Sequence, residues 1–328
     1  MTAKDTSNNP MTSYTGAVHF STSDLNSPAL PADYTFVGSD HGSHTFANAA
    51  TLKTAGAQSV SVKDTVRLSV TGSASVTVNP STASKLVLTA ATTSPGAGAA
   101  DNLTITAQDP FGNTATTYAG SKALTFGGAD SIGGNAPTVS SGSGTPVSFG
   151  SATPITFTNG VSSVSGASNG VMKLYKAQTA TITVTDGSLN NGPGVAVTVS
   201  AGARAGIVLT NVTTSPTPGV TCGGAVGSVA CSSTGESNTP QSLVAGLALA
   251  DQYQNVVTNT TGTALTVDLA TTGNGSGTPS GTAALSVPTA GSSTAQFTLT
   301  RANGNNKSVT LTATVHGSTQ TLTVTLSS

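Results

Sequence analysis

Charged side chains are scarce in this chain of 328 residues. Lys and Arg together number 11, Asp and Glu together number 12, and Glu236 is the only glutamate. Charged residues therefore make up 7% of the chain, against about 25% in ordinary soluble domains. No basic stripe is present to neutralise phosphates, which excludes nucleic acid as a partner. The lone glutamate and the scattered aspartates also argue against the carboxylate pair of a glycosidase.

Good helix formers and long apolar runs are missing as well. Glu, Lys, Arg and Met are rare, whereas Thr, Ser, Gly, Ala, Val and Asn fill the chain. Thr and Val favour strands, and Gly, Asn and Ser favour turns, so we predict an all-β protein. The longest uncharged apolar run, residues 243–250, is far shorter than the ~20 residues of a membrane span. We therefore expect no membrane insertion.

Aromatic residues make up 4% of the chain, and tryptophan is absent. Carbohydrate-binding modules usually expose aromatic platforms, so few residues are available for such a site. We expect most phenylalanines to lie in strands and in the core, namely Phe20, Phe46, Phe126, Phe157 and Phe297. That leaves Phe111 and Tyr253, which follow an aspartate by two residues at the tips of predicted turns.

One short phrase occurs three times, as TAKDTSNN, TAQDPFGN and ALADQYQN. Its aspartates are Asp5, Asp109 and Asp251, and each has an asparagine four residues later and a glycine seven residues beyond that. Other segments repeat with it. KLVLTAATTSP at 85–95 matches GIVLTNVTTSP at 206–216, and alternating strands are predicted at 59–64, 180–186 and 308–315 and again at 73–79, 194–200 and 319–327.

These repeats divide the chain into three units, residues 1–82, 83–202 and 203–328. Each unit has about seven short strands of period two, which is typical of a β-sandwich of about 100 residues. Phe46, Phe157 and Phe297 follow the three aspartates at similar distances. We align them as equivalent positions.

The Asp–Asn pair has two interpretations. In the first it clamps a turn, because Asp109 can accept backbone N–H bonds, Pro110 presets φ and Gly112 can adopt a positive φ. In the second it belongs to a calcium site at a junction, although calcium takes six to eight oxygens and local carboxylates are few. We further predict that Phe111 and Tyr253 pack at the joints between units, near residues 80–84 and 201–205.

All three units resemble bacterial Ig-like repeats of the invasin and intimin type. The resemblance is strongest in TAKDTSNNPMTSYTGAVHFSTSD and in LVLTAATTSPGAGAADNLTITAQDPFGNTATTYAG. It implies tandem Ig-like sandwiches in an extracellular or cell-surface protein that serves as a stalk, spacer or adhesin. The disulfide between sheets and the packed tryptophan of antibody domains are absent here.

Cys222 and Cys231 are the only cysteines, in the stretch TCGGAVGSVAC that the second unit lacks. A disulfide between them would close a loop of about 10 residues and stabilise the fold by about 2.7 kcal/mol in the chain-entropy model. Such a bond requires an oxidising compartment. A redox or metal role and free thiols are the alternatives.

Nothing in the sequence indicates catalysis, a cofactor or a dedicated metal centre. The segment DHGSH brings Asp40, His41 and His44 together, but no further ligands lie near them in the sequence. His19 alternates with apolar neighbours and is expected to face solvent. We predict a protein without enzymatic activity.

In the alignment of the units, residue 1 of the first unit matches a position inside a predicted strand of the second unit. It has no counterpart of residues 84–103, so its sandwich should expose an unpaired edge and uncovered core. In one interpretation the chain belongs to a longer array. In the other, a strand from another subunit fills the gap. Such strand donation from tail to head would propagate into a filament.

We therefore predict an extracellular structural or adhesive array whose partners are copies of itself or neighbouring Ig-like domains. The alternative is a module that binds a surface glycan or protein through long loops, at residues 127–154 of the second unit and 212–241 of the third.

Overall fold

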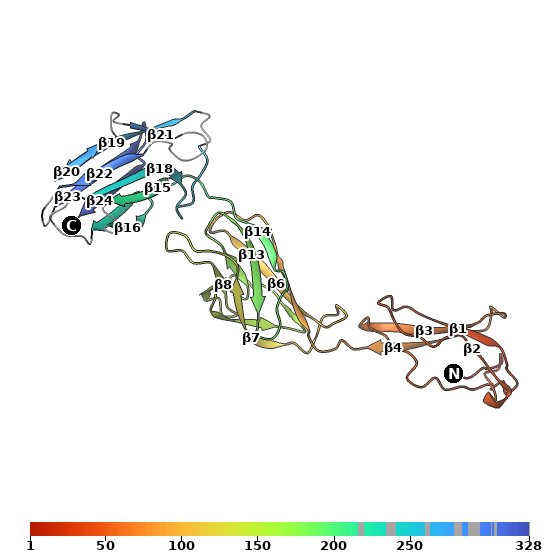
Figure 1. The fold of residues 1–328 in the computed structure, drawn as a ribbon. Coiled ribbons are helices and arrows are strands. Elements are labelled where there is room, and N and C mark those ends of the chain that lie inside the picture. The colour runs from red at the N-terminus through yellow and green to blue at the C-terminus, as the bar shows by residue number, and fades with distance from the viewer. Residues whose placement is uncertain are drawn as a thin grey trace.

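The computed structural model describes residues 1–215, 220–233, 241–259, 263–278, 284–287, 296–302, 304 and 307–327. Within them the chain forms β-strands and one short 3₁₀ turn, η1 (Gly38–Asp40), which confirms the all-β fold class. No helix in this described part is long and apolar enough to span a membrane. Figure 1 shows the sheets in three groups, one after another along an elongated molecule.

The first group is a single four-stranded sheet in the order β2-β1-β3-β4. Its strands are β1 (Ala17–Thr22), β2 (Tyr34–Thr35), β3 (Gly56–Asp64) and β4 (Thr71–Val78). Its small core centres on Tyr14, Val18, Phe20 and Phe36. Every residue of β4 except Val78 is exposed, so both faces of this edge strand are poorly covered.

The second group has two sheets around one core. One sheet has the order β10-β7-β13-β14, and the other has the order β11-β6-β12-β8-β9, with β5 also paired to β6. The strands are β5 (Lys85–Ala90), β6 (Ala100–Gln108), β7 (Gly120–Gly127), β8 (Thr138–Ser140), β9 (Pro146–Ser148), β10 (Ala152–Phe157), β11 (Val161–Ser162), β12 (Val171–Lys173), β13 (Thr179–Thr185) and β14 (Val195–Thr198). Alternate residues of these strands form a buried cluster that combines both sheets, as a sandwich requires.

The third group again has two sheets, in the orders β15-β18-β22-β20 and β16-β17-β24-β23-β19-β21. The strands are β15 (Gly206–Ser215), β16 (Val220–Ala225), β17 (Ser228–Ser233), β18 (Gln241–Ala250), β19 (Leu265–Gly273), β20 (Gly275–Thr278), β21 (Ala284–Val287), β22 (Phe297–Arg301), β23 (Ser308–Val315) and β24 (Thr321–Ser327). The hairpin β16–β17 extends the second sheet by pairing in parallel with β24. Its core draws on residues 207–326.

The predicted alignment of three phenylalanines is wrong. In the second group Phe157 lies opposite Gly120, and its ring contacts Tyr118. The counterpart in the first group is Phe36, whose N–H donates to Gly16 O and whose ring contacts Tyr14. Phe46 lies outside the strands and packs on Phe20 instead.

Phe297 lies opposite Ala245 of β18, on a strand that has a different place in the sandwich. Because the connections differ in length among the three units, similar distances from the aspartate place the three phenylalanines at non-equivalent positions. The spacing of single aromatic residues was therefore a poor guide to structural equivalence, whereas the Asp–Asn phrase was a good one.

Candidate functional site

The three Asp–Asn motifs form the same turn. In each, the aspartate Oδ1 accepts hydrogen bonds of 2.9 Å from the backbone N–H groups two and four residues later. The residue three positions after the aspartate has a positive φ of 68° at Asn8, 87° at Gly112 and 76° at Gln254. The conformation that glycine and asparagine adopt most easily is thus also imposed on a glutamine.

At the first joint, between the first and second sheet groups, this turn binds two other segments of the chain. Asp109 Oδ2 accepts the N–H of Ser81, 3.0 Å away, in the linker. Asn113 Oδ1 accepts the N–H of Ala55 at 2.8 Å, and Asn113 Nδ2 donates to Lys53 O at 2.7 Å. The side chain of Asn113 therefore fastens the second group to the connection that precedes β3.

The second joint repeats this scheme bond for bond. Asp251 Oδ2 accepts the N–H of Gly202 at 2.8 Å. Asn255 Oδ1 accepts the N–H of Ala177 at 2.6 Å, and Asn255 Nδ2 donates to Tyr175 O at 2.7 Å. Asp251 is fully buried here, and Asn255 is 4% exposed. Two joints formed by different sequences thus use the same three cross-joint hydrogen bonds.

The N-terminal turn has the same internal geometry without these cross-joint bonds. Asn9 Nδ2 donates to Asp5 Oδ2 at 3.2 Å, and both side chains are exposed. Within the described residues, nothing donates to Asn9 Oδ1 and no backbone N–H reaches Asp5 Oδ2. The N-terminal turn therefore has the same conformation as the turns at the two joints, but it is exposed to solvent.

The hydrogen bonds at Asp109 favour a clamp over a calcium site. Burial opposes its charge, but bonds from Asn113, Ser81 and Phe111 outweigh burial and hold the pKa of Asp109 below its usual value of 3.8. Both carboxylate oxygens already accept two N–H groups each. A cation could bind only by displacing these donors, so the carboxylate serves as a permanent acceptor for the turn and the linker.

Asp24 holds the connection that meets Asn113. Its carboxylate accepts bonds from the backbone N–H groups of Lys53 and Thr54 and, at 2.6 Å, from the Thr54 hydroxyl. The bond from that hydroxyl is the largest reason why the pKa of Asp24 lies far below 3.8, with the backbone donors adding to it. Asp24 is therefore a positioning residue for the first joint, and it belongs to none of the motifs recognised in the sequence.

The two turn aromatics lie at the joints in different environments. The ring centroid of Tyr253 is 5.0 Å from that of Tyr175, with the rings nearly edge to face, and the Tyr253 hydroxyl lies directly over Gly98, where a Cβ would clash. Phe111 stays 44% exposed. The ammonium of Lys53 lies 5.6 Å above the Phe111 ring, a cation–π distance.

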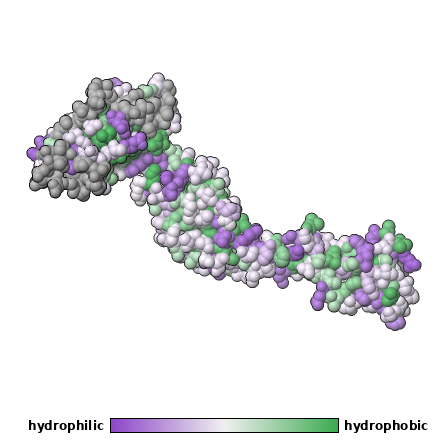
Figure 2. Space-filling model, in the orientation of Figure 1, coloured by the Kyte–Doolittle hydropathy of each residue, from purple (hydrophilic) through white to green (hydrophobic). Residues whose placement is uncertain are grey.

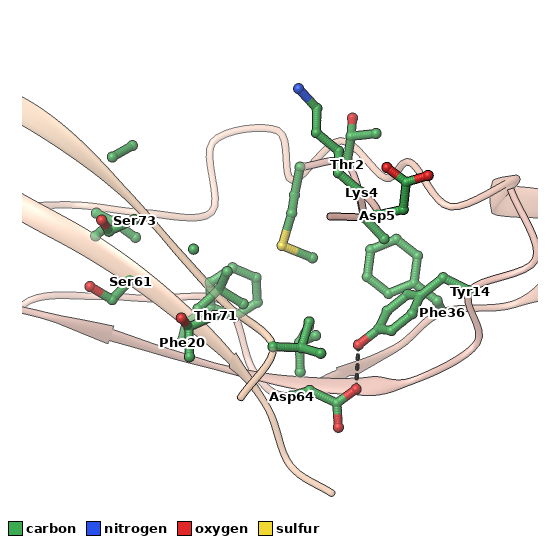
Figure 3. A pocket seen from close by; sticks show the side chains of 18 residues that line it. Thr2, Lys4, Asp5, Tyr14, Phe20, Phe36, Ser61, Asp64, Thr71 and Ser73 are labelled. Atoms are coloured by element: carbon green, nitrogen blue, oxygen red, sulfur yellow. Dashed lines mark hydrogen bonds between the residues drawn. The ribbon is translucent and has the colours of Figure 1, made fainter. Parts of the chain in front are cut away.

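The first sheet group contains an open cavity of about 590 Å³. Figure 3 shows its two sides, with Thr2, Lys4 and Asp5 on one segment and Phe20 and Ser61 on the strands opposite. Tyr14 also lines it and donates to Asp64 Oδ2 at 2.6 Å. Apolar side chains of β1 and β3 form much of the remaining wall, so the cavity lies against the core of this group.

The two cysteines lie opposite each other in the hairpin β16–β17 and form a disulfide. Cys231 is 1% exposed and belongs to the core of the third group. Parts of the predicted binding loop 212–241 lie outside the described residues. The other predicted loop, 127–154, contains β8, β9 and the start of β10, and Val139 and Thr153 within it are buried.

Three of the four histidines, His19, His44 and His316, each lie within 3.1 Å of the carboxylate of one aspartate. His44 Nδ1 lies 3.1 Å from Asp40 Oδ1, and Asp40 Oδ2 also accepts the Tyr34 hydroxyl. His41 stays exposed nearby, and exposed His19 pairs with Asp33. Across the described part of the chain, no group of three or more His, Cys, Asp or Glu side chains is placed to hold a metal ion.

Structural comparison finds bacterial surface proteins of low sequence identity. FdeC, an Escherichia coli adhesin, aligns over 100% of this chain and 90% of its own at 17% identity and a TM-score of 0.35. Invasin, a bacterial integrin-binding protein, aligns over 99% of this chain and 55% of its own at 17% identity and a TM-score of 0.29. For the S-layer protein rSbsC the coverages are 99% and 37%, at 18% identity and a TM-score of 0.23.

This chain therefore spans just over half of the invasin chain and about a third of the S-layer chain. No protein-family model matches the sequence, and no curated protein matches it.

Proposed function

We propose that the chain is a non-enzymatic, extracellular array of three Ig-like domains, residues 1–82, 83–202 and 203–328, that serves as a stalk or filament in a structural or adhesive role. The observation that carries this proposal is the repetition of one joint. Asn113 and Asn255 make the same two bonds to the preceding group, and Asp109 and Asp251 each hold the linker. A spacer needs joints that fix the orientation of successive domains.

The three cross-joint bonds oppose bending because they join different segments. At each joint one bond holds the linker and two hold the connection that precedes β3 or β13. A single bond would act as a hinge, whereas attachment at separated points resists rotation about any one of them. Each bond contributes about 0.5–1.5 kcal/mol, and those accepted by a carboxylate contribute more.

Other features support an extracellular place for this array. The Cys222–Cys231 disulfide forms in oxidising compartments, and the fold consists of strands whose exposed faces carry threonine and serine rather than charge. The sequence resemblance to bacterial Ig-like repeats adds the expectation of a cell-surface stalk or adhesin. We include neighbouring Ig-like domains and other copies of the chain as partners, with strand complementation as the mode of assembly.

Small-angle X-ray scattering of the purified chain tests the proposal. We expect the wild-type protein to scatter as one extended particle with a narrow range of maximum dimensions, in keeping with the elongated shape in Figure 2. The double variant Asn113→Ala and Asn255→Ala should give a broader range, because each joint loses the two cross-joint bonds of its turn asparagine. Asn9→Ala is the matched control and should match the wild type.

A wild-type protein that already scatters as a flexible chain of beads would refute the stalk proposal. Equal broadening in the Asn9→Ala variant would show that the asparagines act on the turns alone and not on the joints.

A further inference from the structure

The N-terminal edge, which we define as residues 1–5, presents backbone groups to solvent in a fixed direction. Ala3 N donates to Gly42 O at 2.8 Å, and Met11 N donates to Ala3 O at 2.9 Å. Neighbouring residues of an extended segment point their backbone groups to opposite sides, so those of Thr2 and Lys4 face away from this pairing. Within the described residues, no hydrogen bond reaches the N–H or C=O of Thr2 or Lys4.

The same edge is covered by a strand in the second group. Ala107 matches Ala3, because Ala107 N donates to Gly160 O at 2.8 Å and Ala115 N donates to Ala107 O at 2.9 Å. On the opposite side, β5 runs antiparallel to β6, with Val87 facing Thr106 and Lys85 facing Gln108. Thr106 and Gln108 occupy the positions of Thr2 and Lys4.

The third group covers its edge in the same register. Val208 of β15 faces Ala248 of β18, and Gly206 faces Ala250. In both groups the covering strand begins a few residues after the linker N–H that binds the buried aspartate, Ser81 for Asp109 and Gly202 for Asp251. The hydrogen bond from the linker to the aspartate and the start of the covering strand thus occur together in both groups.

The covering strand also fills the core. Leu86 and Leu88 of β5 are 2% and 6% exposed, and β5 contacts both β13 and β14. In the first group the corresponding space lies between the N-terminal edge, β3 and β4, and it is the open cavity (Figure 3). Val62 and Phe20 line this cavity, so an apolar side chain entering it would meet an apolar wall.

We propose that the N-terminal edge and the open cavity bind an antiparallel strand in the register of β5 on β6. The donor has a small residue whose N–H reaches Asp5 Oδ2. A few residues later it has an extended segment whose alternate side chains are apolar, as Leu86 and Leu88 are. Its backbone pairs with Thr2 and Lys4. This inference rests on the proposed assembly function and names the site, direction and chemistry of the contact.

A labelled peptide can test this contact on the intact chain. The probe is PSTASKLVLTAA, the sequence of residues 80–91, with fluorescein at its N-terminus. In the folded chain β5 already pairs with β6, so the free peptide must find another edge. We expect saturable binding by fluorescence anisotropy, and no binding by a peptide in which aspartate replaces both leucines.

Variants of Lys4 identify the edge. Lys4→Pro removes an N–H that the fold itself does not use, and we expect it to weaken peptide binding by about tenfold or more, since one lost hydrogen bond costs about 1 kcal/mol and the proline ring obstructs pairing. Lys4→Ala keeps the N–H and should bind within about twofold of wild type. A peptide that carries a photo-cross-linking residue at the position of Leu86 should label the walls of the cavity, including Val62.

Failure of the peptide to bind at millimolar concentration would overturn the inference. Equal binding by Lys4→Pro and Lys4→Ala, or cross-links outside the first sheet group, would also overturn it. The stalk proposal is judged separately by X-ray scattering of the same wild-type protein without peptide. A stiff chain that ignores the peptide would leave the stalk standing and remove the strand-binding edge.

Discussion

The second joint allows a quantitative test of the asparagine clamp. Asn255→Ala removes three side-chain hydrogen bonds, of which Ala177 N and Tyr175 O form the two that cross the joint and Asp251 Oδ2 forms the third. Only the two bonds that cross the joint favour its closed form, so at about 1 kcal/mol each the closed form loses about 2 kcal/mol. A tenfold change in an equilibrium corresponds to 1.4 kcal/mol, so the open form of this joint should become about 30-fold more populated.

Arg204 provides the assay because it is an exposed trypsin site within the second linker. The linker is fixed on both sides, since Ala97 N donates to Ser200 O and Ala205 N donates to Ala250 O. A protease needs an extended substrate segment, so cleavage there requires the joint to open. When opening and closing are fast relative to cleavage, the cleavage rate follows the population of the open form.

We therefore expect Asn255→Ala to raise the rate of cleavage after Arg204 by about 30-fold, measured as the appearance of the new N-terminus by mass spectrometry. Asn9→Ala is the matched control, because the same substitution there removes a turn bond and no described cross-joint bond. An increase below about fivefold, which is worth about 1 kcal/mol, would refute the role of Asn255 as a clamp across the joint. So would equal acceleration by Asn9→Ala.

Three further predictions concern stability. The pKa values of Asp24 and Asp64 are lowered, mainly by bonds from Thr54 and Tyr14 respectively, so the unfolded state binds more protons and stability should fall as pH drops below 3.8; a urea midpoint equal at pH 5 and pH 3 would contradict this. Burial and the bond to Asp64 raise the pKa of Tyr14 from 10.0 to about 12, so stability should also fall between pH 10 and 12, and this alkaline loss should be smaller in Tyr14→Phe. Cys222→Ser with Cys231→Ser should destabilise the third sheet group by about 2.7 kcal/mol, seen in denaturant unfolding; an unchanged midpoint would show that the hairpin is held by pairing alone.

The positions of strands β3, β13 and β23 could be predicted from the sequence because alternation of apolar and polar residues is a local signal. β3, β13 and β23 lie where the alternating segments of the three units were expected. The open side of the first group could also be predicted, because the first unit has no counterpart of residues 84–103 of the second unit. Both predictions needed only patterns within a short stretch or a comparison between stretches.

The cross-joint roles of Asn113 and Asn255 were out of reach of the same reasoning. Spacing showed that each asparagine belongs to the turn of its aspartate, but it did not show which distant backbone groups the amide would meet. Lys53 O and Tyr175 O carry no sequence signature, because any residue supplies a carbonyl. Asp24 was missed for a related reason, since it precedes the Lys53 connection by almost 30 residues and resembles other aspartates in turns.

The disulfide hairpin has a mechanical consequence for a protein that is pulled from its ends. Cys222 and Cys231 are nine residues apart in sequence, yet their Cα atoms are 4.0 Å apart. Nine fully extended residues would span about 30 Å. With the bond intact, forced unfolding of the third sheet group therefore releases about 26 Å less chain than with the bond reduced. Single-molecule stretching in the presence and absence of reductant would record this difference as a change in contour length.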